Sequence, residues 1–319
     1  MKKKIFITGI AGFIGSHLAE YCLHKGALVS GTILEKEDTK NIDNIKDQVS
    51  LFKCDLTNKK RTKQVLGEIK PDIIFHLAGQ SSIALSFKHP DKTLLVNIFS
   101  TLNILESSKE LNINPIIQIA GSAAEYGLIK KEELPIKENV PLVPLSPYAV
   151  SKVTQEMLAL QYYKTNDSKI IITRFFNIEG ARKDHSAVSS FAQQIALIEK
   201  GNKAEICVGN LDAIRDFVDI DDLIKALWVC VVKCDFGESY NIGTGRGYKI
   251  RDVLDMLISL SKNRDIQIKQ TEERIRSNDV PVLISDSTKF KKKTDWIPKT
   301  GLKTTLEKVL NHYRYETKD

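Results

Sequence analysis

A glycine-rich turn near the amino terminus constrains the fold of this chain more than any other feature. The sequence T-G-I-A-G-F-I-G at residues 8–15 follows a short apolar run and opens a helix-patterned stretch. Glycines permit a tight turn and let backbone N–H groups and the helix amino terminus approach a pyrophosphate. Because the strand, turn and helix occur in this order, the motif predicts a dinucleotide site rather than a structural turn alone. Its binding residues would be Gly9, Gly12, Phe13, Ile14 and Gly15.

The first half of the chain alternates β-branched runs with helix-patterned segments. The runs occupy residues 4–8, 27–33, 50–54, 72–76, 115–120 and 169–174. The segments between them have about the length that a right-handed crossover requires, so the pattern predicts a doubly wound parallel α/β sheet of the Rossmann type.

The second half contains shorter and more mixed elements. We expect helices at 187–200, 219–232, 250–261 and 302–314, and strands at 204–208 and 239–242. This pattern predicts a smaller mixed α/β lobe at the carboxyl end that binds the substrate. The dinucleotide-binding domain would comprise residues 1–176 and a returning segment at about 211–244, with the lobe formed by 177–210 and 245–319.

The composition is that of a folded globular protein. The chain has 319 residues, 42% hydrophobic and 27% charged, and no apolar run reaches the roughly 20 residues of a membrane helix. Five cysteines form no C-x-x-C pair and no secretory signal is evident, which favours reduced thiols and a cytoplasmic location. The six histidines share no ligand spacing, so no metal is expected.

The net charge of +7 indicates an anionic ligand rather than nucleic acid or a membrane surface. The lysines are dispersed except for Lys289 and Lys291–Lys293, and no aromatic residues interleave with this cluster. We interpret the cluster as a solvated face. A nucleotide diphosphate would suit the excess positive charge.

The segment S-P-Y-A-V-S-K at residues 146–152 predicts a helix start that carries a proton-transfer pair. Ser146 and Pro147 suit the N-cap and the first helical position. Tyr148 and Lys152 then share one helix face, and a nearby ammonium would lower the pKa of the phenol towards a useful value. The alternative is an exposed helix with an unremarkable tyrosine and lysine.

Two further segments follow predicted strands at the edge where ligands of such sheets bind. Ser122, in A-G-S-A-A-E-Y-G at 120–127, can donate to a substrate oxygen and share a proton with Tyr148, or be an ordinary loop serine. Asp55 and Leu56 follow the third strand. Asp55 would either contact an adenine or cap a helix.

Taken together, these motifs resemble the extended short-chain dehydrogenase/reductase family over nearly the whole chain. Four further segments resemble its GDP-sugar branch, which contains GDP-mannose 4,6-dehydratases and GDP-4-keto-6-deoxy-mannose reductases. The segments are H-L-A-G-Q-S-S (76–82), R-F-F-N-I-E-G (174–180), V-G-N-L-D-A-I-R-D-F-V-D (208–219) and I-R-S-N-D-V-P (275–281).

The resemblance implies roles for individual residues. The catalytic set would be Ser122, Tyr148 and Lys152, and the last two would also contact the cofactor together with Asp55, Leu56, Leu77, Ala78, Gln80, Ala120 and Phe175. The sugar would lie against Gln80, Ser81 and Glu125, and guanosine against Asn177, Ala187 and Ser190. Arg215 and Arg276 would clamp the diphosphate through bidentate contacts, the alternative for each being a surface ion pair.

One departure from the family pattern bears on the reaction. Dehydratases of the family carry a glutamate two residues before the tyrosine of the S-x-x-x-Y-G motif, which is Tyr126 here. In this chain that position is Ala124. Alanine cannot accept a proton, so we expect oxidation of a 4-hydroxyl or reduction of a 4-ketone on a GDP-linked manno-type hexose or heptose, without dehydration. In the oxidative direction a keto acid would have to reoxidise the cofactor. The alternatives are a 4-epimerase, a 4,6-dehydratase, or a non-catalytic dinucleotide-binding regulator.

The cofactor and the assembly are also predicted. The second strand ends G-T-I-L-E at residues 31–35, without an arginine to pair a ribose 2′-phosphate and without a terminal aspartate. We expect NAD rather than NADP. Family resemblance implies a homodimer or homotetramer that pairs through helices at 91–111 and 147–164.

Overall fold

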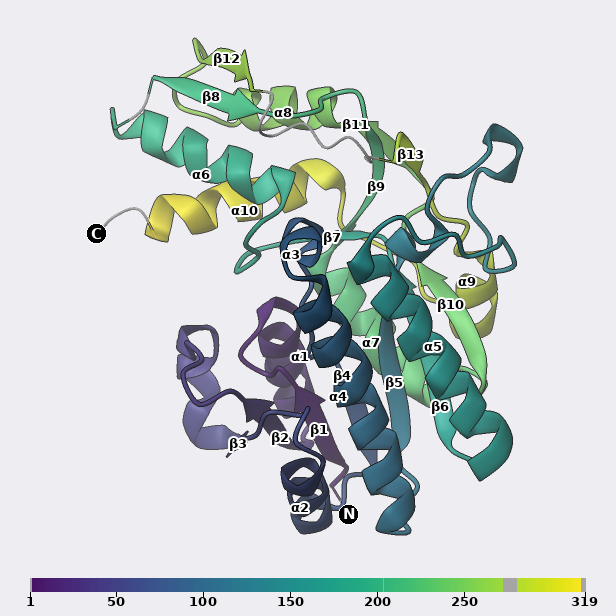
Figure 1. Cartoon of the computed structure of the whole chain (residues 1–319). Coiled ribbons are helices and arrows are strands. Elements are labelled where there is room, and N and C mark those ends of the chain that lie inside the picture. Colours follow the sequence, from purple (N-terminus) through teal and green to yellow (C-terminus); the bar gives the residue numbers. More distant parts are fainter. Residues whose placement is uncertain (1, 203, 272–279, 317–319) are drawn as a thin grey trace.

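A seven-stranded parallel sheet, covered by helices on both faces, forms the larger part of the molecule (Figure 1). The computed structural model describes residues 2–202, 204–271 and 280–316. The strand order is β10-β6-β5-β4-β1-β2-β3. These strands are β1 (Lys4–Thr8), β2 (Leu28–Ile33), β3 (Ser50–Lys53), β4 (Ile73–His76), β5 (Ile116–Ser122), β6 (Lys169–Phe175) and β10 (Glu238–Ile242).

Alternating side chains of each strand supply two separate cores. Ile5 and Ile7 of β1 pack on one face, whereas Phe6 packs on the other. The first face is covered by α1 (Phe13–His24), α7 (Ile220–Lys233) and α9 (Thr288–Thr294). The second is covered by α2 (Lys59–Ile69), α4 (Pro90–Glu110) and α5 (Pro147–Asn166). Burial on both faces explains the unbroken apolar runs of the central strands, such as Ile73–Phe75 of β4 and Ile170–Ile172 of β6.

A second lobe has its own apolar core. It contains α6 (Ala187–Glu199), α8 (Ile250–Ser259), α10 (Leu302–Glu316) and the parallel pair β8 (Glu205–Val208) and β12 (Gln267–Gln270). A small mixed sheet lies between this lobe and the large sheet (Figure 1). Its central strand β9 (Ile214–Asp219) pairs with β7 (Asn177–Glu179), β11 (Gly247–Lys249) and β13 (Val282–Leu283).

Four short helical elements complete the description. They are α3 (Ile83–Lys88) and the 3-10 segments η1 (Lys40–Gln48), η2 (Ala123–Tyr126) and η3 (Lys131–Glu133). Within the described part of the chain, no helix combines the length and the apolar character needed to cross a bilayer.

The sequence predictions for the fold are largely confirmed. All of the expected strands and helices are present within a few residues of their predicted bounds, and the α/β class is correct. The short strands β7, β9, β11, β12 and β13 and helix α9 were not predicted. Within the segment expected to return to the first domain, α7 and β10 adjoin the large sheet, but β9 belongs to the small one. The division into domains stays a prediction.

Candidate active site

The glycine turn forms a cradle that larger residues would obstruct. Gly9 has a φ of +66°, and a Cβ placed on Gly15 would lie 2.2 Å from the carbonyl oxygen of Gly9. Helix α1 begins after Gly12, which provides no side-chain cap, so its first N–H groups face the turn. This geometry fits the pyrophosphate of a dinucleotide, as the sequence predicted.

The loop after β4 is held against this cradle. Thr8 Oγ1 accepts hydrogen bonds from the backbone N–H groups of Leu77 and Ala78, both at 3.0 Å. A Cβ on Gly9 would lie 3.1 Å from the Cα of Ala78. Asn97 of α4 accepts from Gln80 N at 2.7 Å and donates to Gln80 O at 3.1 Å. The predicted cofactor residues of β1 and β4 therefore lie side by side.

His76 at the end of β4 forms hydrogen bonds that hold the same region in place. Its ring is buried between Thr8 Oγ1, 2.9 Å from Nδ1, and Thr101 Oγ1, 3.0 Å from Nε2. Burial lowers the pKa of His76 to about 3, and Lys152 acts in the same direction. The histidine is therefore neutral at physiological pH and serves as a hydrogen-bonded residue of the core.

Ser122, Tyr148 and Lys152 meet at the carboxyl edge of the sheet. Ser122 ends β5, and Tyr148 occupies the first turn of α5, whose N-cap Ser146 accepts from Ala149 N at 3.1 Å. The Ser122 side chain lies near the Tyr148 phenol and acts to lower its pKa. Lys152 Nζ lies 5.9 Å from the centre of the Tyr148 ring. The three predicted catalytic residues are thus brought together.

The electrostatics of this trio differ from expectation in one respect. Burial raises the pKa of Tyr148 to about 12, although the nearby Ser122 side chain opposes the shift. The prediction that Lys152 lowers the pKa of Tyr148 is wrong, because the effect of burial dominates. The Lys152 ammonium donates instead to the carbonyl oxygen of Ala120 at 2.9 Å. Burial also lowers the pKa of Lys152 to about 8.

Glu125 does not occupy the place predicted for it. Its side chain is 0% exposed, and its Oε1 accepts from the backbone N–H of Ser122 at 2.5 Å. The prediction that Glu125 faces the sugar is therefore wrong in this structure. The adjacent Ala124 is partly exposed, because in the 3-10 turn η2 consecutive residues point in different directions.

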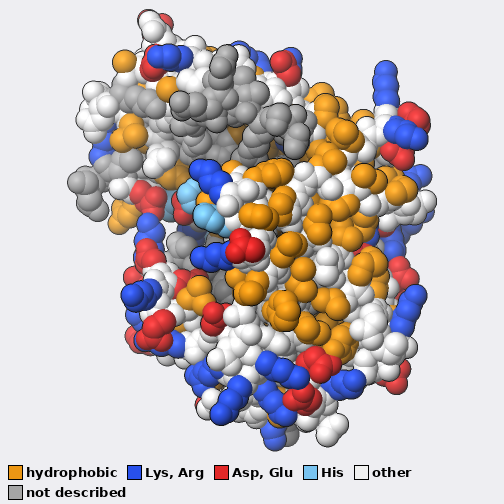
Figure 2. Space-filling view, viewed as in Figure 1, with side chains coloured by type: hydrophobic (Ala, Val, Ile, Leu, Met, Phe, Trp, Pro, Cys, Tyr) orange, Lys and Arg blue, Asp and Glu red, His pale blue; other side chains and the backbone are white. Residues whose placement is uncertain are grey.

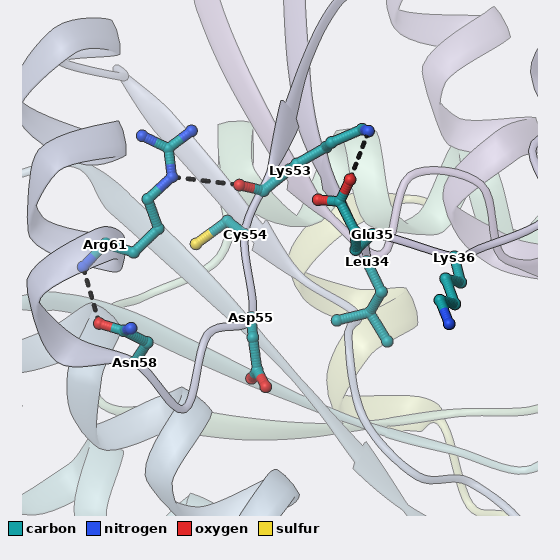
Figure 3. Close-up of a pocket in the computed structure, with 8 residues that line it drawn as sticks. All are labelled: Leu34, Glu35, Lys36, Lys53, Cys54, Asp55, Asn58 and Arg61. Atoms are coloured by element: carbon teal, nitrogen blue, oxygen red, sulfur yellow. Dashed lines mark hydrogen bonds and ion pairs between the residues drawn. The ribbon is translucent and has the colours of Figure 1, made fainter.

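A pocket of about 480 Å³ lies beside the ends of β2 and β3 (Figure 3). Glu35, Lys36, Lys53, Asp55 and Arg61 are among its lining residues. Lys53 Nζ pairs with Glu35 at 2.7 Å, and Arg61 donates to the carbonyl of Lys53 at 3.1 Å. This is the region where the adenosine half of a bound dinucleotide lies in a Rossmann fold.

Asp55 does not cap the following helix. Asn58 is the N-cap of α2 and accepts from Arg61 N at 3.0 Å, whereas Asp55 accepts from the N–H and hydroxyl of Thr57. Leu56 is buried beside it. The capping alternative is excluded, and an adenine contact stays a prediction.

The predicted substrate residues come from both lobes. Asn177 donates to the carbonyl of Asp216 at 3.2 Å, next to Arg215 on β9. Ala187 and Ser190 lie in the first turn of α6, and Ser81 is exposed. The Gln80 side chain points towards α4, where it donates to Thr93 Oγ1 at 2.8 Å. Arg276 lies outside the described residues.

Sequence reasoning missed the residue that organises the small sheet. Asp216 is fully buried and accepts from Thr244 N, Gly245 N and Ser285 N at 2.9, 2.9 and 3.1 Å. Its carboxylate thus joins β9 to the segments before β11 and after β13. The only available signal was its position after Arg215 in the R-D-F-V-D motif.

Comparisons with known proteins fit this geometry. A family profile described as GDP-mannose 4,6 dehydratase matches residues 6–309. This chain belongs to that family, within the extended short-chain dehydrogenases/reductases. A GDP-6-deoxy-D-mannose reductase of Pseudomonas aeruginosa is 28% identical, with 100% of both chains covered. A GDP-mannose 4,6-dehydratase of Vibrio cholerae is 29% identical over 93% of this chain and 90% of its own.

Solved structures are similar over the full length of this family member. The structure of RMD from Pseudomonas aeruginosa complexed with NADPH has a TM-score of 0.84 at 28% identity and covers 99% of this chain and 100% of its own. The UDP-glucose 4-epimerase of Thermotoga maritima has a TM-score of 0.88 at 27% identity with the same coverage. This family member is thus a nucleotide-sugar enzyme with a nicotinamide dinucleotide cofactor, which the glycine cradle fits.

Proposed function

We propose that this enzyme transfers a hydride at C4 of a GDP-linked manno-type hexose or heptose and does not remove water from the sugar. One observation carries the proposal: Ala124 occupies the partly exposed position beside Ser122, whereas Glu125 is buried beneath it. Dehydration needs an acid–base group at the C5–C6 edge of the sugar. Alanine provides none, and Glu125 points into the protein.

The residues of the trio would divide the proton chemistry among them. Tyr148 would exchange the proton of the C4 oxygen, and Ser122, whose side chain lies near the Tyr148 phenol, would orient that oxygen. Lys152 would hold the cofactor ribose, and its bond to Ala120 O fixes its position. Hydride transfer is the chemistry that a bound nicotinamide supplies here.

Arg215 and Arg276 would form the handle for the diphosphate. Arg215 lies on β9. Its neighbour Asp216 is held by hydrogen bonds from the segment before β11 and the segment after β13. The guanidinium fork suits bidentate binding of phosphate oxygens, and the net charge of +7 favours an anionic ligand. Full-length similarity to a GDP-6-deoxy-D-mannose reductase supports guanosine as the base.

NAD is the proposed cofactor. The carboxylate of Glu35 lines the pocket beside β2 and β3 (Figure 3) and would accept hydrogen bonds from ribose hydroxyls. A 2′-phosphate would compete with the Glu35 carboxylate, which is paired with Lys53. In the oxidative direction the reduced cofactor would need a second substrate, such as a keto acid, to reoxidise it.

The reaction is tested by mass spectrometry after incubation with NAD and GDP-mannose. A product without loss of water, formed with equal NADH, supports the proposal. A product lighter by one water, without net NADH, would show that dehydration occurs despite Ala124.

A 4-epimerase is the second candidate, favoured by the structural similarity to the epimerase of Thermotoga maritima. An epimerase would return the hydride to the same carbon, so neither mass nor free cofactor would change. Inversion at C4 in the recovered sugar, seen by NMR, distinguishes it from the proposed reaction.

The proposed assembly is a homodimer or homotetramer in the cytoplasm. Large apolar side chains gather on the face formed by α4 and α5 (Figure 2), among them Leu95, Phe99, Val150 and Met157. Their contiguous exposure is unusual for a monomer. The face coincides with the helices predicted to pair two subunits.

All five cysteines, which lie in the described residues, are free thiols.

A further inference from the structure

A buried carboxyl pair lies directly beneath the proposed catalytic serine. Glu125 of η2 and Glu156 of α5 are 0% and 1% exposed. Both approach Arg174 of β6, whose Nε lies 3.9 Å from Glu125 Oε2 and 2.9 Å from Glu156 Oε2. The two carboxyl groups therefore adjoin the same N–H group in the protein interior.

Arg174 forms a bidentate ion pair with Glu156. Its Nε and Nη2 donate to the two oxygens of that carboxylate at 2.9 and 2.6 Å, and Ser239 adds a bond at 2.7 Å. Its Nη1 donates to Tyr126 OH and to the carbonyl of Glu138. One guanidinium is thus hydrogen-bonded to one carboxylate, and a second buried carboxylate would share that charge only across the longer 3.9 Å separation from Arg174 Nε.

Glu125 meets only part of its hydrogen-bonding capacity. Oε1 accepts from Ser122 N, but Oε2 is buried with no donor among the described residues. An ionised carboxylate facing Glu156 could only accept, as Glu156 does. A proton on Oε2 turns it into a donor to Glu156 and removes the surplus negative charge.

We propose that Glu125 is a positioning residue: it carries a proton in the resting enzyme, donates it in a hydrogen bond to Glu156, and holds Ser122 in place without adding negative charge near Tyr148. This inference rests on the proposed roles of Ser122 and Tyr148. Burial first, and then the charge of Glu156, raise the pKa of Glu125 to about 8. The titratable and charged groups that interact with it are Glu156, Tyr148 and Lys152 from α5 and Arg174 from β6.

The proton has a consequence for catalysis. Ionised Glu125 would raise the pKa of Tyr148 and of Lys152 through its charge. Below about pH 8 the carboxyl is neutral and this effect is absent; above it, the carboxylate opposes loss of the Tyr148 proton. Ionisation of Glu125 therefore limits the ability of Tyr148 to act as a base at alkaline pH.

Infrared spectroscopy of the whole protein tests the protonation state without any assay of activity. We expect a protonated-carboxyl band at about pH 6.5 that is lost by about pH 9.5, on either side of the pKa of about 8. Glu125→Gln, which keeps the bond to Ser122 N and stays neutral, should abolish the band. Glu132→Gln, at an exposed site, should leave it intact. Absence of the band in the parent protein overturns the proposal whatever the variants do, as does its persistence in Glu125→Gln.

A pH profile with NAD and GDP-mannose tests the link to catalysis. Glu125→Gln should keep activity within about threefold at neutral pH and should continue to gain activity at alkaline pH where the parent levels off. Glu125→Ala should lose about 10²-fold, because Ser122 is no longer held. Identical profiles for parent and Glu125→Gln would refute the positioning role. Activity of Tyr148→Phe would instead refute the proposed function and leave the infrared result standing.

Discussion

The ammonium of Lys152 lies 2.9 Å from the carbonyl oxygen of Ala120 and thereby joins helix α5 to the end of strand β5. Ser122 follows Ala120 on that strand, and Tyr148 precedes Lys152 by one helical turn. The bond therefore fixes the two proton-transfer side chains relative to each other. It also gives Lys152 a structural task beyond any contact with a cofactor.

Replacement of the phenol tests its role in catalysis. Tyr148→Phe should keep the fold and the bound cofactor but reduce turnover by about 10²-fold or more, because the proton carrier is removed. Tyr163→Phe, at an exposed position of the same helix, should behave like the parent. Steady-state kinetics check the result, and turnover of Tyr148→Phe within a few-fold of the parent would contradict the assignment.

The nucleotide handle is tested by binding. Arg215→Ala should weaken GDP binding by about 2–5 kcal/mol if the guanidinium contacts the diphosphate in a desolvated site. Arg264→Ala, at an exposed site of the second lobe, serves as the control. In the parent, GDP should raise the melting temperature more than UDP or dTDP does. Equal stabilisation by all three nucleotides would argue against a GDP-sugar substrate.

Cofactor preference should depend on Glu35. Glu35→Ser removes the carboxylate from the pocket beside Lys36 and Arg61. Because the remaining side chains there are more basic, the ratio of kcat/KM for NADP over NAD should increase by about tenfold. Glu68→Ser, on the exposed face of α2, should not change it. A parent that already prefers NADP would refute the assignment of NAD.

Acid stability should depend on His76. Burial lowers its pKa to about 3, so below the ordinary value of 6.5 the unfolded chain binds a proton that the folded protein does not. The melting temperature should therefore fall as the pH drops from about 7 to about 5, and the fall should be smaller in His76→Gln. The exposed His24→Gln is the matched control. The same pH slope in all three proteins would mean that other groups cause it.

The apolar face of α4 and α5 should control association. Phe99 on α4 is 49% exposed, so Phe99→Asp would place a charge in the proposed interface. Light scattering at micromolar concentration should show the parent as a dimer or tetramer and this variant as smaller. Val232→Asp, at an exposed site on α7, should not change the mass. A monomeric parent would contradict the proposed assembly.

The sequence by itself determined the large sheet and the positions of the proposed catalytic residues. Their signals are local: the glycines at 9, 12 and 15 require a turn after a strand, and Tyr148 and Lys152 share a helix face through their spacing. Parallel strands then bring their carboxyl ends to one edge, which places Ser122 near α5.

Tertiary structure decided what depends on residues far apart in the chain. The strands of the small sheet are short, and β9 acquires its conformation from pairing with β7, β11 and β13 around Asp216. Likewise, the sequence could not distinguish an exposed Glu125 from a buried one, because its neighbours Glu156 and Arg174 come from other elements. Burial and charge pairing are properties of the folded arrangement, and they set the orientation and the protonation of that carboxyl group.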